Sequence, residues 1–98
     1  MTVVVNVPAS LRQFSAGQRQ IKVDLADPFT LGDVFDRLHA TAPGVVERAL
    51  DEQRRIRPHV NVFVNGECIR TSSRCGLETP VAAGAEVWII PAVSGGSG

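Results

Sequence analysis

Two stretches near the start of the chain alternate in ways that predict β-strands. Residues 2–7 are almost wholly apolar and rich in β-branched side chains, which favours a strand in the interior of a sheet. Residues 20–25 alternate strictly between apolar and polar side chains, as in a strand with one solvated face. Pro8 ends the first stretch and turn-forming residues follow up to Gly17. We therefore expect these two strands to pair as a hairpin.

The hydrophobic spacing then lengthens and predicts a helix. Apolar residues recur at the i, i+3, i+4, i+7 positions of a single helical face: Leu31, Val34, Phe35 and Leu38. Thr30 is placed as the N-cap, and the acidic Asp33 suits the positive end of the helix dipole. Pro43 disfavours helical geometry in the residue before it, so the helix is expected to end near Thr41.

A second, shorter helix is predicted over residues 44–50. Its apolar stripe consists of Val45, Val46, Ala49 and Leu50. Residues 51–58 are polar and are expected to form a loop that Pro58 closes. Arg54, Arg55 and Arg57 form the densest basic cluster of the chain, and such a run is typical of a solvated loop.

Three further strands are predicted in the second half of the chain. Residues 60–64 alternate, and Asn65-Gly66 is a strong turn signal because both residue types tolerate positive φ. Residues 67–70 would form the returning strand, and residues 86–90 the last one. The predicted order is strand, strand, helix, short helix, strand, strand, strand, which indicates an α+β domain.

Two of these strands carry more apolar side chains than a sheet covered on one face requires. Phe63 points opposite to the valines beside it, and Trp88 and Ile90 lie opposite to Val87 and Ile89. One interpretation is an exposed apolar patch that binds a partner. The other is that Trp88 belongs to the core and Phe63 lies under a loop.

Length and charge limit the classes of function. With 98 residues, of which 44% are hydrophobic, the chain is long enough for one core and too short for two. The formal net charge is zero, so no overall field attracts nucleic acid or an anionic membrane. The chain opens directly into the first predicted strand without a leader or an apolar span, so a cytoplasmic protein is expected.

The cysteines and histidines give no catalytic or metal-binding pattern. Cys68 and Cys75 are too few for an iron–sulfur or closed zinc site and lack C-x-x-C spacing, so they are interpreted as plain thiols. His39 and His59 have no recognisable triad partners and are expected to be structural or solvent-facing. No metal, no cofactor and no independent catalysis are therefore predicted.

The chain ends in Pro91, two further apolar residues and a run of Ser and Gly through Gly98. Glycine has no Cβ, so a Gly-Gly segment fits a slot too narrow for other residues and lets its backbone approach a nucleotide closely. Such an ending is useful where the C-terminal carboxylate itself reacts. By composition alone it is more typical of a flexible terminus or an artificial linker remnant.

Three segments together resemble the MoaD/ThiS family of ubiquitin-like sulfur carrier proteins. They are the Val60–Gly66 hairpin, the 81–87 approach to the last strand and the Ile90–Gly96 ending. The resemblance covers residues 1–96 and is greatest to actinobacterial sulfur carriers of cysteine synthesis, including the 11–14 segment. It implies a β-grasp fold, with a mixed sheet of four to five strands, one main helix and a short second helix. A domain over 1–91 and a flexible Gly-rich tail over 92–98 are expected.

The resemblance also implies a mechanism. An ATP-dependent adenylating enzyme docks on the sheet, joins the carboxylate of Gly96 to AMP, and sulfur displaces AMP to give a thiocarboxylate. Gly95 and Ser94 thread the tail into that enzyme, and Pro91 holds its base extended. The implied docking residues are Phe63, Trp88 and Ile90. A second partner accepts the sulfur for cysteine, molybdopterin, thiamin or a secondary metabolite, and the sequence does not select among these.

Ser97 and Gly98 depart from the family pattern, which ends at the second glycine. With Gly96 in a peptide bond there is no free carboxylate at that residue. Three explanations are open: a metal-dependent peptidase removes the dipeptide, Gly98 itself is activated, or the dipeptide is artificial. We favour processing between Gly96 and Ser97. The alternative function is a non-covalent β-grasp interaction module, or a ubiquitin-like modifier that forms isopeptide bonds.

Overall fold

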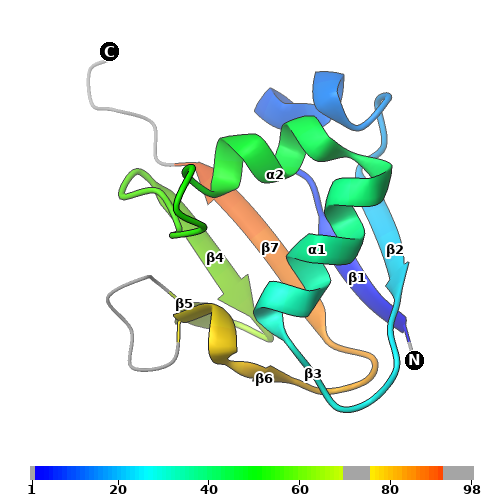
Figure 1. Cartoon of the computed structure of the whole chain (residues 1–98). Helices are drawn as coiled ribbons and strands as arrows, with labels where there is room; N and C mark the ends of the chain where they lie inside the picture. Colours follow the sequence, from blue (N-terminus) through cyan, green and yellow to red (C-terminus); the bar gives the residue numbers. More distant parts are fainter. Residues whose placement is uncertain (1, 70–75, 92–98) are drawn as a thin grey trace.

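A computed structural model describes residues 2–69 and 76–91 of the chain. The described residues form strands, two α-helices and two 3-10 helices (Figure 1). In chain order they are β1 (Thr2–Asn6), the 3-10 helix η1 (Ala9–Phe14), β2 (Gln20–Asp24), β3 (Phe29–Thr30), α1 (Leu31–Thr41), α2 (Pro43–Ala49), β4 (Val60–Val64), β5 (Glu67–Ile69), the 3-10 helix η2 (Gly76–Glu78), β6 (Pro80–Val81) and β7 (Glu86–Pro91).

Five strands form one mixed sheet in the order β2-β1-β7-β4-β5. The predicted hairpin of β1 and β2 is confirmed, with Val3 opposite Val23 and Val5 opposite Ile21. β1 also pairs in parallel with β7, so it lies inside the sheet as its apolar sequence predicted. The parallel central pair, flanked by antiparallel neighbours and crossed by a helix, is the β-grasp topology expected from the sequence.

The predicted start and end of α1 are confirmed. The Asp33 backbone N–H donates to Thr30 Oγ1 at 3.3 Å, and the Thr30 N–H donates to Asp33 Oδ2 at 2.9 Å. This reciprocal capping box pairs backbone donors that the first helical turn leaves unpaired. Pro43 occupies the first turn of α2, where its missing N–H costs no hydrogen bond.

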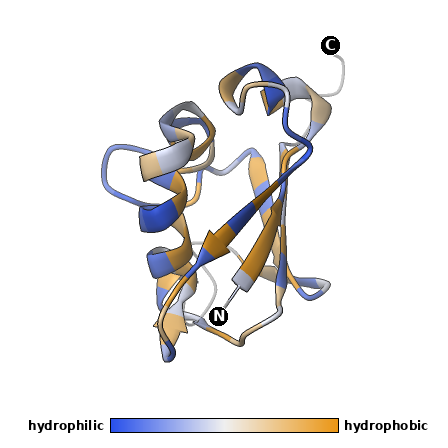
Figure 2. Ribbon diagram, turned by 90° about the vertical axis from the view of Figure 1, so that its right-hand side faces the viewer, coloured by the Kyte–Doolittle hydropathy of each residue, from blue (hydrophilic) through white to orange (hydrophobic). Residues whose placement is uncertain are grey.

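The core lies between the sheet and the two α-helices (Figure 2). Leu31, Phe35 and Leu38 of α1 are at most 1% exposed, and they share one cluster with Val62 and Ile89 of the sheet. Burying each side chain of this size stabilises the fold by roughly 1.5–3 kcal/mol. The helical face predicted from the spacing is therefore the face that covers the sheet.

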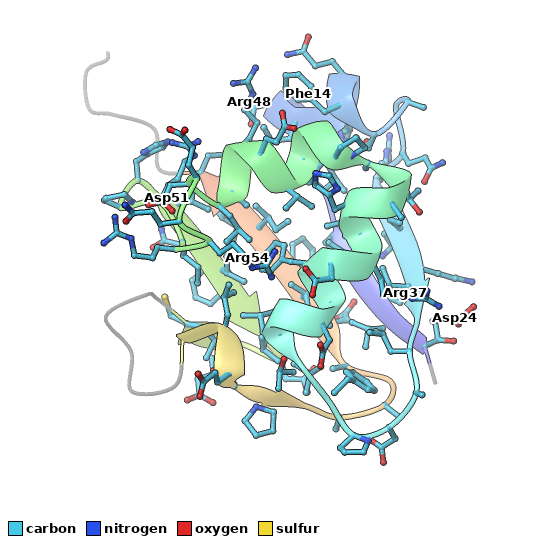
Figure 3. All side chains as sticks on the ribbon, viewed as in Figure 1. Phe14, Asp24, Arg37, Arg48, Asp51 and Arg54 are labelled. Carbon is cyan, nitrogen blue, oxygen red and sulfur yellow. The ribbon has the colours of Figure 1, made fainter. Side chains whose placement is uncertain are left out.

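The segment after β1 contains regular secondary structure where the sequence predicted only turns. Instead of plain turns it forms η1, which packs against α2. A Cβ at Gly44 would lie 2.7 Å from Phe14 Cδ1, so only glycine lets the helix approach this ring. Arg48 lies over the face of the same ring, with its guanidinium carbon 4.6 Å from the ring centroid (Figure 3).

The loop before β7 also contains unpredicted structure. Phe29 pairs with Val81 and Thr30 with Pro80, so β3 and β6 form a second, two-stranded sheet at the start of α1. The hairpin turn between β4 and β5 is as predicted, with φ of 49° at Asn65 and 86° at Gly66.

The last described residue, Pro91, coincides with the predicted end of the folded domain, but the predicted tail 92–98 lies outside the described part. That boundary stays a prediction. In the ranges 2–69 and 76–91, neither helix has the length and apolar composition needed to cross a membrane.

Candidate functional site

The face of the sheet that points away from the helices carries large apolar side chains. Side chains alternate along β7, so Val87 and Ile89 are buried under the helices at 1% and 0% exposure. Trp88 and Ile90 point the other way and are 45% and 43% exposed. The alternative that Trp88 belongs to the core is therefore wrong.

The strand register brings these side chains together. Phe63 of β4 lies directly opposite Trp88 and is half-buried, while Ile90 lies one step further along β7. Asn6 of β1 lies opposite Trp88. Val4, two residues before Asn6 on the same face, is therefore diagonal to Trp88, and it is half-buried. We call Val4, Phe63, Trp88 and Ile90 the outer-face patch. All three docking residues expected from the sequence belong to it.

Asn6 forms a polar border of the outer-face patch that sequence reasoning missed. Its side chain is only 4% exposed, and its Nδ2 donates to the Val87 carbonyl at 3.4 Å. Gln20 Nε2 in turn donates to Asn6 Oδ1 at 2.9 Å. A buried amide is stable only when it is hydrogen-bonded in this way. The one signal in the sequence was an Asn within an otherwise apolar strand.

The other edge of the patch reaches Cys68. This residue lies opposite Phe63 across β4 and β5, is half-buried and has a free thiol. The interpretation as a plain thiol fits this setting. Cys75 lies outside the described residues.

The tail begins where β7 ends. Pro91 pairs with Val60 of β4 and is half-buried, so the chain is still extended at the proline, as the sequence predicted. It follows directly after Ile90 of the outer-face patch. The residues expected to thread, react or be cut, Ser94, Gly95, Gly96 and Ser97, lie outside the described residues and stay predictions.

The arginines of the loop between α2 and β4 contact other residues of the same chain. Arg54 Nη1 lies 2.9 Å from Asp36 Oδ1, and Arg55 Nε lies 3.3 Å from Asp51 Oδ2. Arg57 Nε donates to the Glu47 carbonyl at 3.2 Å. These contacts agree with the interpretation of this cluster as a solvated loop.

The described part of the chain offers little chemistry of its own. Within residues 2–69 and 76–91, no three His, Cys, Asp or Glu side chains gather closely enough to hold a metal ion. His39 and His59 are both exposed. What this arrangement offers is a binding face next to the start of a glycine-rich tail.

Comparison with known proteins identifies the family. A model described as the ThiS family matches residues 5–96. The chain belongs to this family. Over 98 residues it is 40% identical to the sulfur carrier protein CysO of Mycobacterium tuberculosis, covering 98% of this chain and 100% of the relative.

Two solved structures share the ThiS-family fold seen here. The BexX/CysO complex of Amycolatopsis orientalis contains a chain with a TM-score of 0.80 and 32% identity, covering 96% of this chain and 99% of that one. SAMP1, a small archaeal modifier protein from Haloferax volcanii, has a TM-score of 0.81 and 30% identity, covering 98% and 100%. The β-grasp fold predicted from the resemblance is confirmed.

Proposed function

We propose that this protein is a sulfur carrier that reacts through the carboxylate of Gly96. The observation that carries the proposal is the match to the ThiS family, which extends through the tail and ends on Gly96, the second residue of the Gly-Gly pair. The similarity to proteins named sulfur carriers over nearly the whole chain supports it. The carrier supplies the acyl group, and its partner supplies the catalysis.

The chemistry proceeds in two steps. A carboxylate is a poor electrophile, so the Gly96 carboxylate first attacks the α-phosphorus of ATP held by the adenylating partner, and pyrophosphate leaves. A sulfur nucleophile at the oxidation level of sulfide then attacks the acyl carbon and AMP leaves, which gives a thiocarboxylate. Gly95 and Ser94 lie in the partner's narrow channel during these steps. A biosynthetic enzyme then accepts the sulfur.

The outer-face patch is the proposed docking surface for the adenylating enzyme. Trp88 and Ile90 expose large apolar areas, and aromatic residues of this kind commonly dominate the binding energy of an interface. Pro91 follows the patch directly, so an enzyme bound there sits where the tail begins. Binding at the patch and insertion of the tail can therefore occur in a single complex.

Activation at Gly96 requires that Ser97 and Gly98 be removed first. We propose that a metal-dependent peptidase cleaves the bond between Gly96 and Ser97. The proposal places the carrier in the cytoplasm, where ATP and reduced sulfur are available.

Intact-mass spectrometry tests the proposal. A chain ending at Gly96 is incubated with a recombinant ThiS-family adenylating enzyme, ATP and sulfide. We expect the mass increase of one sulfur replacing one oxygen, and no increase without ATP. The full chain should react only after a cell extract has removed its last two residues. No adenylate or thiocarboxylate on the chain ending at Gly96 would refute the proposal.

Attachment to other proteins is the second candidate function, favoured by the similarity to a small archaeal modifier protein. A modifier would react with lysine amines after the same adenylation. The two functions differ in their products: a modifier gives isopeptide-linked conjugates in a cell extract, whereas a carrier gives the thiocarboxylate and a sulfur-containing small molecule.

A further inference from the structure

A shallow groove of about 220 Å³ lies between β2 and α1. It lies at the β2 edge of the sheet, opposite to the edge that β4 and β5 form, and away from the end of β7 (Figures 1 and 3). Its lining comes from the last residues of β2 and the second half of α1: Lys22, Val23, Asp24, Arg37, Ala40 and Thr41. The sulfur-carrier proposal makes no use of this groove.

One wall of the groove is the unpaired edge of β2. Hydrogen-bonded pairs alternate along an antiparallel ladder, and the Val7 N–H donates to the Arg19 carbonyl at 2.8 Å. The backbone groups of Lys22 and Asp24 therefore point away from β1 and toward the groove. The Asp24 carbonyl confirms this direction, since it accepts from Arg37 Nε at 3.1 Å. In the described part of the chain no strand pairs with this edge.

The side chains make the groove cationic. Thr2 Oγ1 donates to Asp24 Oδ1 at 2.8 Å, which directs this carboxylate toward β1. Neither of the salt bridges in the described ranges includes Lys22 or Arg37. Arg37 uses Nε for the Asp24 carbonyl, so its two terminal nitrogens are available to a carboxylate. Two cations thus flank a backbone edge that can still donate and accept.

We propose that this groove binds an extended acidic peptide segment of a partner protein. The segment adds to β2 as a further strand through the Lys22 N–H and carbonyl and the Asp24 N–H. Lys22 and Arg37 bind its acidic side chains, and the small Ala40 and the Thr41 hydroxyl leave room for the others. Lys22 lies opposite Val4, so the groove adjoins the outer-face patch at the β2 edge, while Trp88 and Phe63 lie on β7 and β4, further across the sheet.

NMR titration of the ¹⁵N-labelled chain tests the proposal. The probe is a capped heptapeptide of glutamates with valine at its third and fifth positions, because Lys22 and Arg37 lie on opposite sides of the β2 edge and an added strand must present glutamates on both of its faces. We expect saturable shifts at the amides of Lys22, Arg37 and Thr41. The same peptide with lysine in place of glutamate should not bind, nor should one N-methylated at every second residue, which can no longer donate along one edge.

Substitutions separate the charge from the strand addition. The double change Lys22→Ala with Arg37→Ala should weaken binding by about tenfold or more, whereas Arg55→Ala, which does not line the groove, should leave it unchanged. Lys22→Pro removes an outward N–H without breaking the ladder with β1, and should bind more weakly than Lys22→Ala. Thermal unfolding checks that each variant is folded. If Lys22→Pro does not fold, the N-methylated peptide tests the backbone hydrogen bonds instead.

Three results would each overturn the proposal. The first is equal binding of the glutamate and lysine peptides, and the second is equal binding of the N-methylated peptide. The third is a set of shifts confined to Trp88 and Phe63, which would assign the peptide to the outer-face patch. Failure of Gly96 activation would leave this titration unaffected, so the two proposals fail separately.

Discussion

Asp51 organises the loop that joins α2 to β4. Its Oδ1 accepts the backbone N–H groups of Gln53 and Arg55, each at 2.9 Å. The Arg55 N–H is the main cause of a lowered pKa for the Asp51 carboxyl. Partial desolvation opposes it, while the Gln53 N–H and the charge of Arg55 lower the pKa further.

The lowered pKa predicts how this loop responds to acid. A carboxyl whose pKa is lower in the folded than in the unfolded chain stabilises the fold above the unfolded value, about 3.9 for aspartate. That contribution is lost as the pH falls through the folded-state pKa. At about pH 7 the free energy of unfolding, measured with urea, should therefore be lower for Asp51→Ala than for the unsubstituted chain. The difference between the two should shrink in strong acid.

Arg55→Ala serves as the control for this pH dependence. It removes the side-chain charge but keeps both backbone N–H donors, so it should have the smaller effect of the two. A difference between Asp51→Ala and the unsubstituted chain that stays constant into strong acid would contradict the lowered pKa.

Single residues also mark where sequence reasoning succeeds and where it stops. Side-chain parity placed Trp88 and Ile90 on the face opposite to Ile89, because a strand has a period of two. Parity does not say whether that second face is covered, so the exposure of Trp88 required the structure. The tight approach of Gly44 to Phe14 joins segments whose contact no local pattern encodes.

At the scale of an element, β7 has buried side chains on one face and exposed side chains on the other. Its isoleucines are adjacent in sequence and opposite in environment: Ile89 is 0% exposed and Ile90 43%. The sheet face under the helices holds the fold together, and the other face is available to partners. The two side chains are chemically identical, so they form a matched pair.

We predict that truncating these isoleucines has opposite consequences. Ile89→Ala should lower the free energy of unfolding by about 2–5 kcal/mol, because it leaves a cavity in the core. Ile90→Ala should change it by about 0.5 kcal/mol or less and weaken binding of the adenylating enzyme instead. Urea denaturation and a binding titration on the same samples measure both. Equal losses of stability would show that the outer face is structural.

The elements also differ in how far the sequence predicted them. Both α-helices and all five strands of the main sheet were expected, since each carries either a clear hydrophobic period or a strong turn signal. The 3-10 helix η1 and strands β3 and β6 were missed. A 3-10 helix of six residues and strands of two residues are too short to show a period, and β3 pairs with β6 across about half the chain. The groove was missed as well, because it depends on how α1 lies against the edge of β2.

For the whole molecule, the different roles proposed for the outer-face patch and the tail predict two kinds of kinetic defect. Trp88 is proposed to bind the adenylating enzyme equally in the ground and transition states, so Trp88→Ala should raise the KM for the carrier by roughly tenfold or more with little change in kcat. Gly96 is proposed to carry the reacting carboxylate, so in a chain ending at residue 96, Gly96→Ala should lower kcat.

Pyrophosphate release, measured as a function of carrier concentration, gives both constants. Gln13→Ala, an exposed position on η1, should leave both unchanged and controls for general surface effects. Thermal unfolding checks that all three variants are folded; we expect small changes, since Trp88 is 45% exposed and residue 96 follows β7 in the sequence. An unchanged KM in Trp88→Ala would remove the outer-face patch as the docking surface. It would leave the reaction at Gly96 standing, because a carrier reaches its partner through whichever face lets the tail enter.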